Sequence, residues 1–425
     1  MKRQFNLLLF AAVATLGFIS ASDGAAAAPT CANGKISVGA VSTITGPADF
    51  SEVPKATQAA FDAVNAAGGI NGCKIDYTIA DDKADPAVAA QAARDLIDNK
   101  EVVALVGSAS LLDCAVNAPT YGRKSVLSVQ GLGVDAACFS SPNVAPVNVG
   151  PYTLSTAVAY YASRELKTQK LCAFFIIIGG TQEAYKQGIA NWEKISGQKI
   201  HLLDLTLPFQ GDLTPYVIKA RDAGCDAVLT NQIEPQVVQL IKTVDAQKIT
   251  GINWLFLAPG YTVEVAKTLA DSKQSIYVGT EWEPYTEQNS PANKEWVAAM
   301  NAAKRPLTAF SQGGYMSAQV MIDTIKKVDG PVTRESINKV LASMKPTNYA
   351  LAGSPYVFGT AAVHAPMQAT KVMKLEKGAW TVETKDWLIV GSPGTDEGGT
   401  VFIYRHWVLG KSLEAANLNT PASDF

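Results

Sequence analysis

The sequence predicts an α/β protein made of two doubly wound lobes, each built on a parallel sheet. Short β-branched runs alternate with helical stretches twice, first between residues 35 and 129 and again between residues 152 and 278. Helices between consecutive strands imply parallel pairing and right-handed crossovers. A chain of 425 residues is long enough for two domains, and two similar units indicate a ligand cleft between their strand ends.

Residues 1–28 have the pattern of a secretory signal peptide. Lys2 and Arg3 precede an apolar run from Leu7 to Ile19, and small residues follow, with cleavage expected after Ala27. The apolar run is too short to span a bilayer. We therefore expect a periplasmic or secreted protein, in a compartment that permits disulfides.

Local signals justify each element of the first unit. Gly68 and Gly69 suit the left-handed residues that end a helix. Asp85 is a good N-cap before Pro86 at the first position of a helix that runs to Asn99. Alternating or continuous apolar patterns predict strands at residues 35–42, 74–80, 102–106 and 125–129.

The second unit repeats this order. A helix is expected from about Tyr152 to Lys167. Strands are expected at residues 171–178, 200–205, 227–230, 254–257 and 276–278, with helices between them. Residues 371–376 and 379–383, joined at Lys377-Gly378, predict a hairpin.

Six cysteines in an exported chain predict three disulfides. Cys31 and Cys73 each lie just before a strand of the first unit, and Cys172 and Cys225 lie at the starts of two strands of the second. Cys114 and Cys138 follow the ends of two further strands. Neighbouring strands therefore predict the pairs Cys31–Cys73, Cys114–Cys138 and Cys172–Cys225. A zinc site is the poorer alternative, because no CxxC occurs and the three histidines are isolated.

Composition and motifs argue against several classes of function. The 36 basic and 38 acidic residues give a net charge of -2 with no basic run, so we expect no nucleic-acid partner. No GxSxG, Walker or HExxH motif is present, and we expect neither an enzyme nor a bound metal. Residues 131–136 match GxGxxA, but no acid follows about twenty residues on, so we expect no cofactor. For Asp81 and Asp82, a surface or helix-capping role is favoured over a metal or acid/base pair.

Three segments carry a resemblance to a known family: NAAGGINGCKI from residue 65, DDKADPAVAAQAARDLI from residue 81 and VVALVGSAS from residue 102. They resemble the amino-terminal lobe of periplasmic substrate-binding proteins of the leucine/isoleucine/valine-binding type, which serve ABC importers. The resemblance is strongest over residues 35–129, continues in order to about 280, and is thin over the last 70 or so residues. The tail after Gly391 is not explained by the family pattern.

The resemblance implies three crossings between the lobes through a multi-stranded hinge. Proline, glycine and aromatic residues mark them near residues 149–151, 281–285 and 349–356. Lobe 1 is then expected to comprise residues 29–150 and 282–350. Lobe 2 is expected to comprise residues 151–281 and 351–425.

The resemblance also implies a set of ligand-binding residues. In the first lobe, the family loop that holds a ligand carboxylate matches Ser108, Ala109 and Ser110, where small residues let N–H groups and hydroxyls approach an anion. The alternative is a plain polar turn. Gln130 and Gly131 match the next loop, although Leu132 replaces a hydroxyl residue there.

In the second lobe, Tyr185 matches the tyrosine that closes over the ligand in the family. Asn231 and Gln232 occupy the place of a further aromatic contact. Tyr261 ends the segment in which amino-acid binders carry the acid that pairs with the ligand ammonium, and that acid is absent here. Either Glu234 or Glu281 could substitute for it. Candidate apolar walls, each with a core position as the alternative, are Phe50, Trp282, Tyr285 and Tyr315.

These observations predict an exported, monomeric solute-binding protein. It is expected to capture a small carboxylate-bearing ligand, either an amino acid or an aromatic or aliphatic acid, by hinge closure and to deliver it to an ABC transporter permease. One alternative is an extracellular module that senses a ligand. Another is a cleft hydrolase with Ser108 or Ser110 as nucleophile, which would need a histidine or buried carboxylate within hydrogen-bond reach of the serine.

Overall fold

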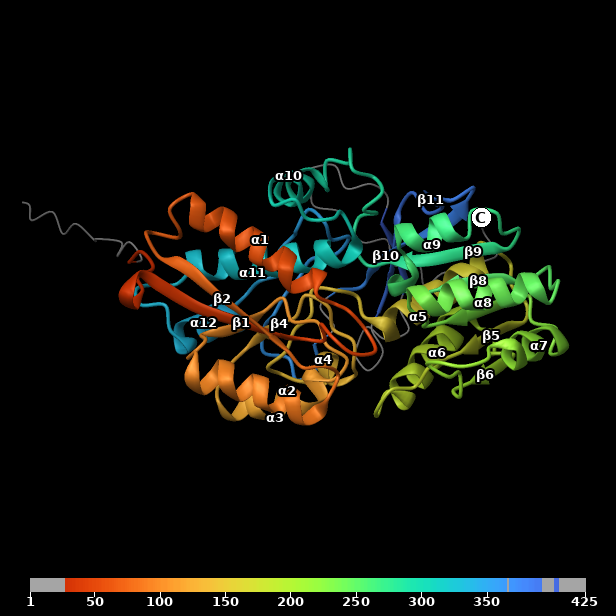
Figure 1. The fold of residues 1–425 in the computed structure, drawn as a ribbon, viewed down its shortest axis with the longest axis horizontal. Helices are drawn as coiled ribbons and strands as arrows, with labels where there is room; N and C mark the ends of the chain where they lie inside the picture. The colour runs from red at the N-terminus through yellow and green to blue at the C-terminus, as the bar shows by residue number, and fades with distance from the viewer. Residues whose placement is uncertain (1–26, 365–366, 392–400, 405–425) are drawn as a thin grey trace, which may run out of the picture.

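The protein has two α/β lobes that lie side by side along its longest axis in a computed structural model (Figure 1). The structure describes residues 27–364 and 367–391, and the backbone of residues 401–404. The predicted signal peptide, residues 1–28, lies outside the described residues except for Ala27 and Ala28. Among the helices of the described part of the chain, none combines the length and apolar character needed to cross a membrane.

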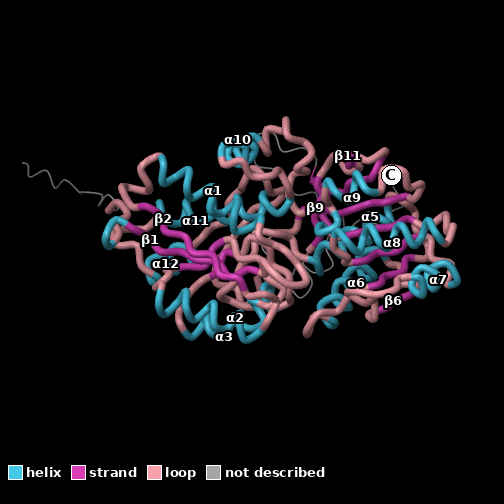
Figure 2. The backbone as a smooth tube through the Cα atoms, viewed as in Figure 1, coloured by secondary structure: helices cyan, strands magenta, loops and turns pink. Residues whose placement is uncertain are grey.

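The first lobe is built on a four-stranded parallel sheet. Its strands, in spatial order, are β2 (Lys74–Asp81), β1 (Lys35–Ser42), β3 (Ala104–Val106) and β4 (Ser128–Val129). One face is covered by α1 (Glu52–Ala66) and α11 (Ala309–Lys326), and the other by α2 (Pro86–Arg94) and α3 (Asp113–Arg123), as Figure 2 shows. The lobe also contains α4 (Ala137–Ser140), α10 (Lys294–Ala302) and α12 (Arg334–Ala342). The expected parallel sheet is therefore confirmed.

The residues predicted to begin and end helices in the first lobe do so in the structure. The Asp85 carboxylate accepts hydrogen bonds from the N–H groups of Ala87 and Val88, which caps α2. The helix continues as a π-turn over Asp95–Asn99, so its expected end at Asn99 is confirmed. Gly69 has φ 81° and a side chain there would collide with the Cys73 carbonyl, so only glycine fits this turn.

The second lobe is built on a mixed sheet. Its parallel part runs in spatial order through β6 (Leu202–Asp204), β5 (Leu171–Phe174), β7 (Ala227–Thr230), β8 (Asn253–Phe256) and β9 (Ser275–Thr280). An antiparallel extension adds β10 (Ala369–Glu376), β12 (Trp387–Val390) and β13 (Val401–Tyr404), and β11 (Ala379–Val382) pairs with β10. The expected hairpin is confirmed, and it extends the parallel part of the sheet in the antiparallel direction, because β10 pairs with β9 in the opposite direction.

The helices of this lobe alternate with its parallel strands, beginning with a helix before β5. They are α5 (Pro151–Arg164), α6 (Gln182–Ser196), α7 (Thr214–Asp222), α8 (Glu234–Ala246) and α9 (Val263–Thr268). The side of α5 that meets the sheet is buried, as is Trp192 of α6, whose indole N–H donates to the Ser163 hydroxyl of α5. The core of the lobe therefore lies between the sheet and these helices.

Several strands are shorter than the sequence predicts, among them β3, β4, β5 and β6. The strand expected at residues 171–178 ends at Phe174, because the N–H and C=O of Ile176 bond to the side chain of Asn231 instead of to a neighbouring strand. The strand expected at residues 125–129 covers only β4, because Ser125 has φ 53° and belongs to the turn after α3. Side-chain bonds and turn geometry are not visible in a hydrophobic pattern.

The three predicted disulfides are confirmed. Their Cα–Cα distances are 5.9 Å for Cys31–Cys73, 5.1 Å for Cys114–Cys138 and 5.9 Å for Cys172–Cys225. Each pair bonds two segments of one lobe, and no cysteine of the chain is free.

The chain passes between the two sheets near the three expected crossings. Gly150 precedes α5, Glu281 follows β9, and Thr347 pairs with Tyr356 in an antiparallel bridge. Between the second and third of these points, α11 returns to the first lobe and packs on α1, where the Thr57 hydroxyl donates to the Gly314 carbonyl. The residue boundaries of the lobes stay a prediction. Residues 392–400 and 405–425 of the tail lie outside the described residues.

Candidate ligand-binding cleft

A cavity of about 870 Å³, a volume that includes its opening to solvent, lies where loops of the two lobes face each other. It borders the segments after β4, β5, β7, β8 and β9, at the carboxyl ends of parallel strands, where ligands of α/β proteins bind. The carboxyl ends of the parallel strands in both sheets, where ligands of such proteins bind, therefore face the same cavity.

The cavity wall is mostly apolar. Phe50, Leu132 and Tyr152 contribute to it, together with the half-buried Ile178 and Phe209. The polar side chains in the lining are Asn148, Thr181, Asn231, Gln236 and the two acids Asp135 and Glu281. Among the described lining residues there is no lysine, arginine or histidine. The cavity therefore suits a largely apolar ligand with a small polar part.

Four of the predicted binding residues line this cavity: Phe50, Tyr185, Asn231 and Glu281. Tyr185 is held by aromatic neighbours, since it stacks on Phe175 with ring centroids 4.5 Å apart and meets Tyr152 edge-on at 4.9 Å. Burial raises the pKa of its hydroxyl, so the group is a neutral hydrogen-bonding partner.

Asn231 fixes the rim of the cavity. Its Oδ1 accepts from the Ile176 N–H at 2.8 Å, and its Nδ2 donates to the Ile176 carbonyl at 2.9 Å. This pairing holds residues 176–178 beside the cavity instead of in the sheet. The described contacts of Asn231 thus position this part of the cavity wall.

Glu281 is a buried acid at a crossing between the lobes. Its Oε1 accepts hydrogen bonds from the Asn148 Nδ2 at 2.9 Å and from the Gly150 N–H at 2.7 Å. No described residue donates to Oε2. Burial raises the pKa of the Glu281 carboxyl to about 7, so near neutral pH the group can either donate or accept.

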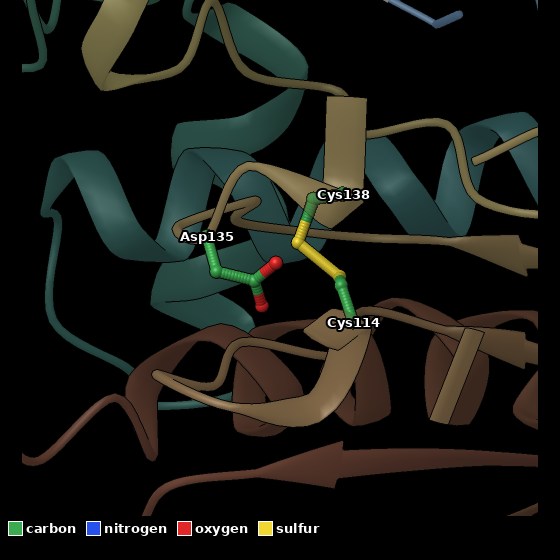
Figure 3. A group of neighbouring side chains, drawn as sticks. All are labelled: Cys114, Asp135 and Cys138. Atoms are coloured by element: carbon green, nitrogen blue, oxygen red, sulfur yellow. A yellow bond between two sulfur atoms is a disulfide. The ribbon is translucent and has the colours of Figure 1, made fainter. Parts of the chain in front are cut away.

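Asp135 is a second buried acid in the lining, and it lies beside a disulfide (Figure 3). Its carboxylate accepts from the N–H groups of Ala137 at 2.8 Å and Ala115 at 3.2 Å, while burial raises its pKa to about 6. Ligand atoms of Asp135, Cys114 and Cys138 lie within 4.8 Å of one another, which is close enough for metal ligation. Because the two sulfur atoms are bonded to each other, they are not thiolate ligands.

The predicted carboxylate loop does not border the cavity. Ser108 Oγ accepts from the Val41 N–H at 3.1 Å, and Ser110 Oγ accepts from the N–H groups of Leu112 and Asp113 at 2.9 Å each. Ala109 is buried between the first sheet and the loop at Leu132. The hydroxyls of this loop stabilise the loop itself, and their role in binding stays a prediction.

The neighbouring Asp82 is buried rather than on the surface or capping a helix, so that interpretation is wrong. It accepts hydrogen bonds from the Thr43 hydroxyl at 2.8 Å, the Ala84 N–H at 2.9 Å and the Ser110 hydroxyl. This is the buried carboxylate that the hydrolase alternative requires. However, Ser110 Oγ is buried away from the cavity lining and already accepts two N–H groups, so the arrangement serves the loop.

The other predicted polar residues are also buried outside the lining. Gln130 Nε2 donates to Asp113 at 2.9 Å, while neither amide atom of Gln232 has a hydrogen-bond partner among the described residues. A side chain at Gly131 would collide with Val53, so this position serves close packing. None of the three contacts the cavity, and their binding roles stay predictions.

The remaining predicted aromatics are core residues of the structure. The Trp282 indole N–H donates to the Val147 carbonyl at 3.2 Å, and the Tyr261 hydroxyl lies 2.9 Å from that of Thr286. Tyr285 packs against Tyr261, and Tyr315 is buried in α11. The sequence missed other lining residues, among them Asp135, which lies inside the GxGxxA segment that was considered only as a cofactor loop.

A family model described as periplasmic binding protein matches residues 35–379. The chain belongs to the periplasmic binding protein family. A Leu/Ile/Val-binding protein homologue from Brucella melitensis biotype 1 is 24% identical over 376 residues, which cover 83% of this chain and 93% of the relative. The family and fold are those of solute-binding proteins, not enzymes.

Solved structures share the fold of this periplasmic binding protein. A possible leucine/isoleucine/valine-binding protein from Rhodopirellula baltica has a TM-score of 0.72 at 16% identity, covering 82% of this chain and 96% of that one. A fatty acid ABC transporter substrate-binding protein from Thermomonospora curvata has a TM-score of 0.70 at 16% identity, covering 89% and 98%. A family of periplasmic proteins agrees with the three disulfides, which fit an exported chain.

Proposed function

We propose that this protein is an exported, monomeric solute-binding protein that captures a small amphiphilic acid between its lobes and delivers it to an ABC transporter permease. The observation that carries the proposal is the largely apolar cavity, to which both lobes contribute lining residues. The pattern of residues 1–28 supports export.

Hinge closure follows from the position of the cavity between the lobes. A ligand that contacts residues of both lobes, such as Leu132 of the first and Ile233 of the second, favours the closed state by the contacts it makes only there. The permease would then recognise the closed form. No covalent step is required.

The ligand is proposed to be an amino acid or an aromatic or aliphatic acid. Without a basic side chain in the described lining, a ligand carboxylate must be held by neutral donors. Glu281 in its protonated form is one such donor, because Oε2 has no partner among the described residues. A ligand ammonium would instead pair with ionised Glu281, so the same residue allows for both ligand types.

The experiment is a thermal unfolding screen of the mature protein against amino acids, aliphatic acids, aromatic carboxylates and uncharged amides. A ligand at about 100 times its dissociation constant adds roughly 2.7 kcal/mol to the unfolding free energy. We expect a rise in melting temperature with at least one acid class. A panel without any shift, including with amino acids, would overturn the proposal.

A pair of valine variants tests whether binding occurs in this cavity. Val134 lines the cavity, while Val263 is 43% exposed on α9. Val134→Trp should fill part of the cavity and weaken the ligand found in the screen at least tenfold. Val263→Trp should bind it as the wild type does. Equal affinity for both variants would place the ligand elsewhere.

A further inference from the structure

A second hollow adjoins the ligand cavity. It is a groove of about 820 Å³, again including its open part, and it shares Leu111, Ile176, Ile178 and Phe209 with the cavity lining. Four residues in common mean that one wall runs from the cavity into the groove. The two hollows therefore adjoin each other along this wall.

The side chains that line the groove are almost all apolar. Pro47 and Leu112 line it from the first lobe, and Ile177, Leu207 and Pro208 line it from the second. Of its described lining residues only Thr206 is polar, and the Thr206 hydroxyl is bonded to Asp204 at 2.6 Å. Among the described lining residues, acid and amide side chains thus occur in the cavity and not in the groove.

The common wall exists because β5 ends early. Residues 176–178 leave the sheet after Phe174, and Asn231 holds Ile176 in this position through two hydrogen bonds. Ile176 and Ile178 line both hollows, whereas Ile177 lines only the groove. A continued strand would have put alternate side chains on opposite faces of the sheet.

We propose that the groove is the outer half of the ligand site and holds the apolar chain of an elongated amphiphile whose polar end lies in the cavity beside Glu281. This inference rests on the proposed function and specifies its substrate class. Both lobes line the groove, so the apolar chain of a ligand in the groove would contact both lobes and favour the closed state. Among the described side chains that line the groove, only that of Thr206 offers a hydrogen bond to a polar ligand group.

The expected effect of chain length follows from apolar burial. Each methylene removed from water contributes about 0.8 kcal/mol, which is roughly a fourfold gain in affinity. A ligand confined to the inner cavity would stop gaining affinity once that cavity is full. A ligand that enters the groove continues to gain.

The test is isothermal titration calorimetry of the mature protein with two homologous series, straight-chain carboxylates and straight-chain 2-amino carboxylates, below their micelle concentrations. In the series whose head group binds, we expect affinity to rise roughly fourfold per methylene from about four to about twelve carbons. Ile177→Asp should remove this gain for the longer members and leave the short members unchanged.

Two further variants keep the test decisive. Pro47→Asp, at an exposed position of the groove, should act as Ile177→Asp does, and Val263→Asp, outside both hollows, should behave as the wild type. An early plateau in affinity, or long ligands that bind both groove variants as they bind the wild type, would overturn the inference while short ligands still support the proposed function. If no ligand of either series binds, including the short ones, the proposed function itself would be overturned.

Discussion

At the scale of single residues, the ionisation of Glu281 should be visible in the stability of the free protein. Burial raises the pKa of this carboxyl from 4.5 to about 7. Between these values the unfolded chain binds fewer protons than the native one at this residue, so the unfolding free energy falls as pH rises. The contribution of Glu281 is present below about pH 4.5 and is lost through about pH 7, a loss of the order of 3 kcal/mol.

Glu281→Gln should therefore flatten the decline in stability between pH 5 and 7.5. Urea unfolding at a series of pH values measures this, with the exposed Glu335→Gln on α12 as control, which should keep the wild-type profile. An unchanged decline in Glu281→Gln would mean that the buried carboxyl does not titrate in this range.

The same residue should also reveal the charge of the ligand through the pH dependence of binding. A carboxylate without an amine needs the protonated Glu281 as donor, so its affinity should fall by up to tenfold per pH unit above about pH 7. An amine-bearing ligand needs the ionised form, and its affinity should fall below about pH 7. Titration calorimetry from pH 5 to 9 separates the two. A flat profile with either ligand class would contradict direct contact with Glu281.

Residue identities in the cleft were only partly predictable. Phe50, Tyr185, Asn231 and Glu281 line the cavity as the sequence indicates. Ser110 does not, because its hydroxyl is bonded to Asp82 and to two backbone N–H groups of its own loop. A motif shows that a hydroxyl is present, but only the three-dimensional structure shows whether that hydroxyl is already bonded.

At the scale of elements, two disulfides of similar effect on stability should differ in their effect on binding. Cys114–Cys138 joins α3 to α4 beside Asp135 in the cavity lining, whereas Cys172–Cys225 lies near the starts of β5 and β7, away from it. Replacing either pair with serine should lower the unfolding free energy by roughly 3 to 4 kcal/mol. Only loss of Cys114–Cys138 should also weaken ligand binding.

Urea unfolding and titration calorimetry on the two double variants provide both readouts. The Cys172→Ser, Cys225→Ser variant controls for the general effect of lower stability, since its closed loop is the longer one, with a sequence separation of 53 against 24. If that control lost affinity as strongly as the Cys114→Ser, Cys138→Ser variant, local anchoring of the Asp135 loop would be excluded.

Element positions were predicted well and element ends less well. The hydrophobic period located β5 and β4, but both are shorter than the apolar runs that contain them. The side-chain amide of Asn231 ends the pairing of β5. The left-handed backbone of Ser125 moves the start of β4 to a later residue. These interactions depend on residues distant in sequence or on backbone geometry, so an apolar run alone does not indicate them.

At the scale of the whole molecule, the repeated strand and helix pattern was sufficient to predict two lobes. The antiparallel extension was not predictable from that repeat, because β10, β12 and β13 join the second sheet from the carboxyl-terminal part of the chain. Which sheet edge accepts such strands depends on β9 being available at the edge of the parallel part. That property belongs to the assembled sheet rather than to any one segment.

Ligand binding should bring the two lobes together. All six native cysteines are in disulfides, so cysteines introduced at the exposed positions Asp49 and Gln210 can carry spin labels on opposite lobes. Saturating ligand should shift the distance distribution between these labels to shorter values, because the closed state makes the additional contacts. Pulsed electron resonance measures this distribution. Labels at Ala63 and Arg123, both exposed in the first lobe, should keep their separation. An unchanged distance between Asp49 and Gln210 at full ligand occupancy would mean that the ligand enters a preformed closed cavity, and the proposed recognition of a closed state by the permease would then lack its physical basis.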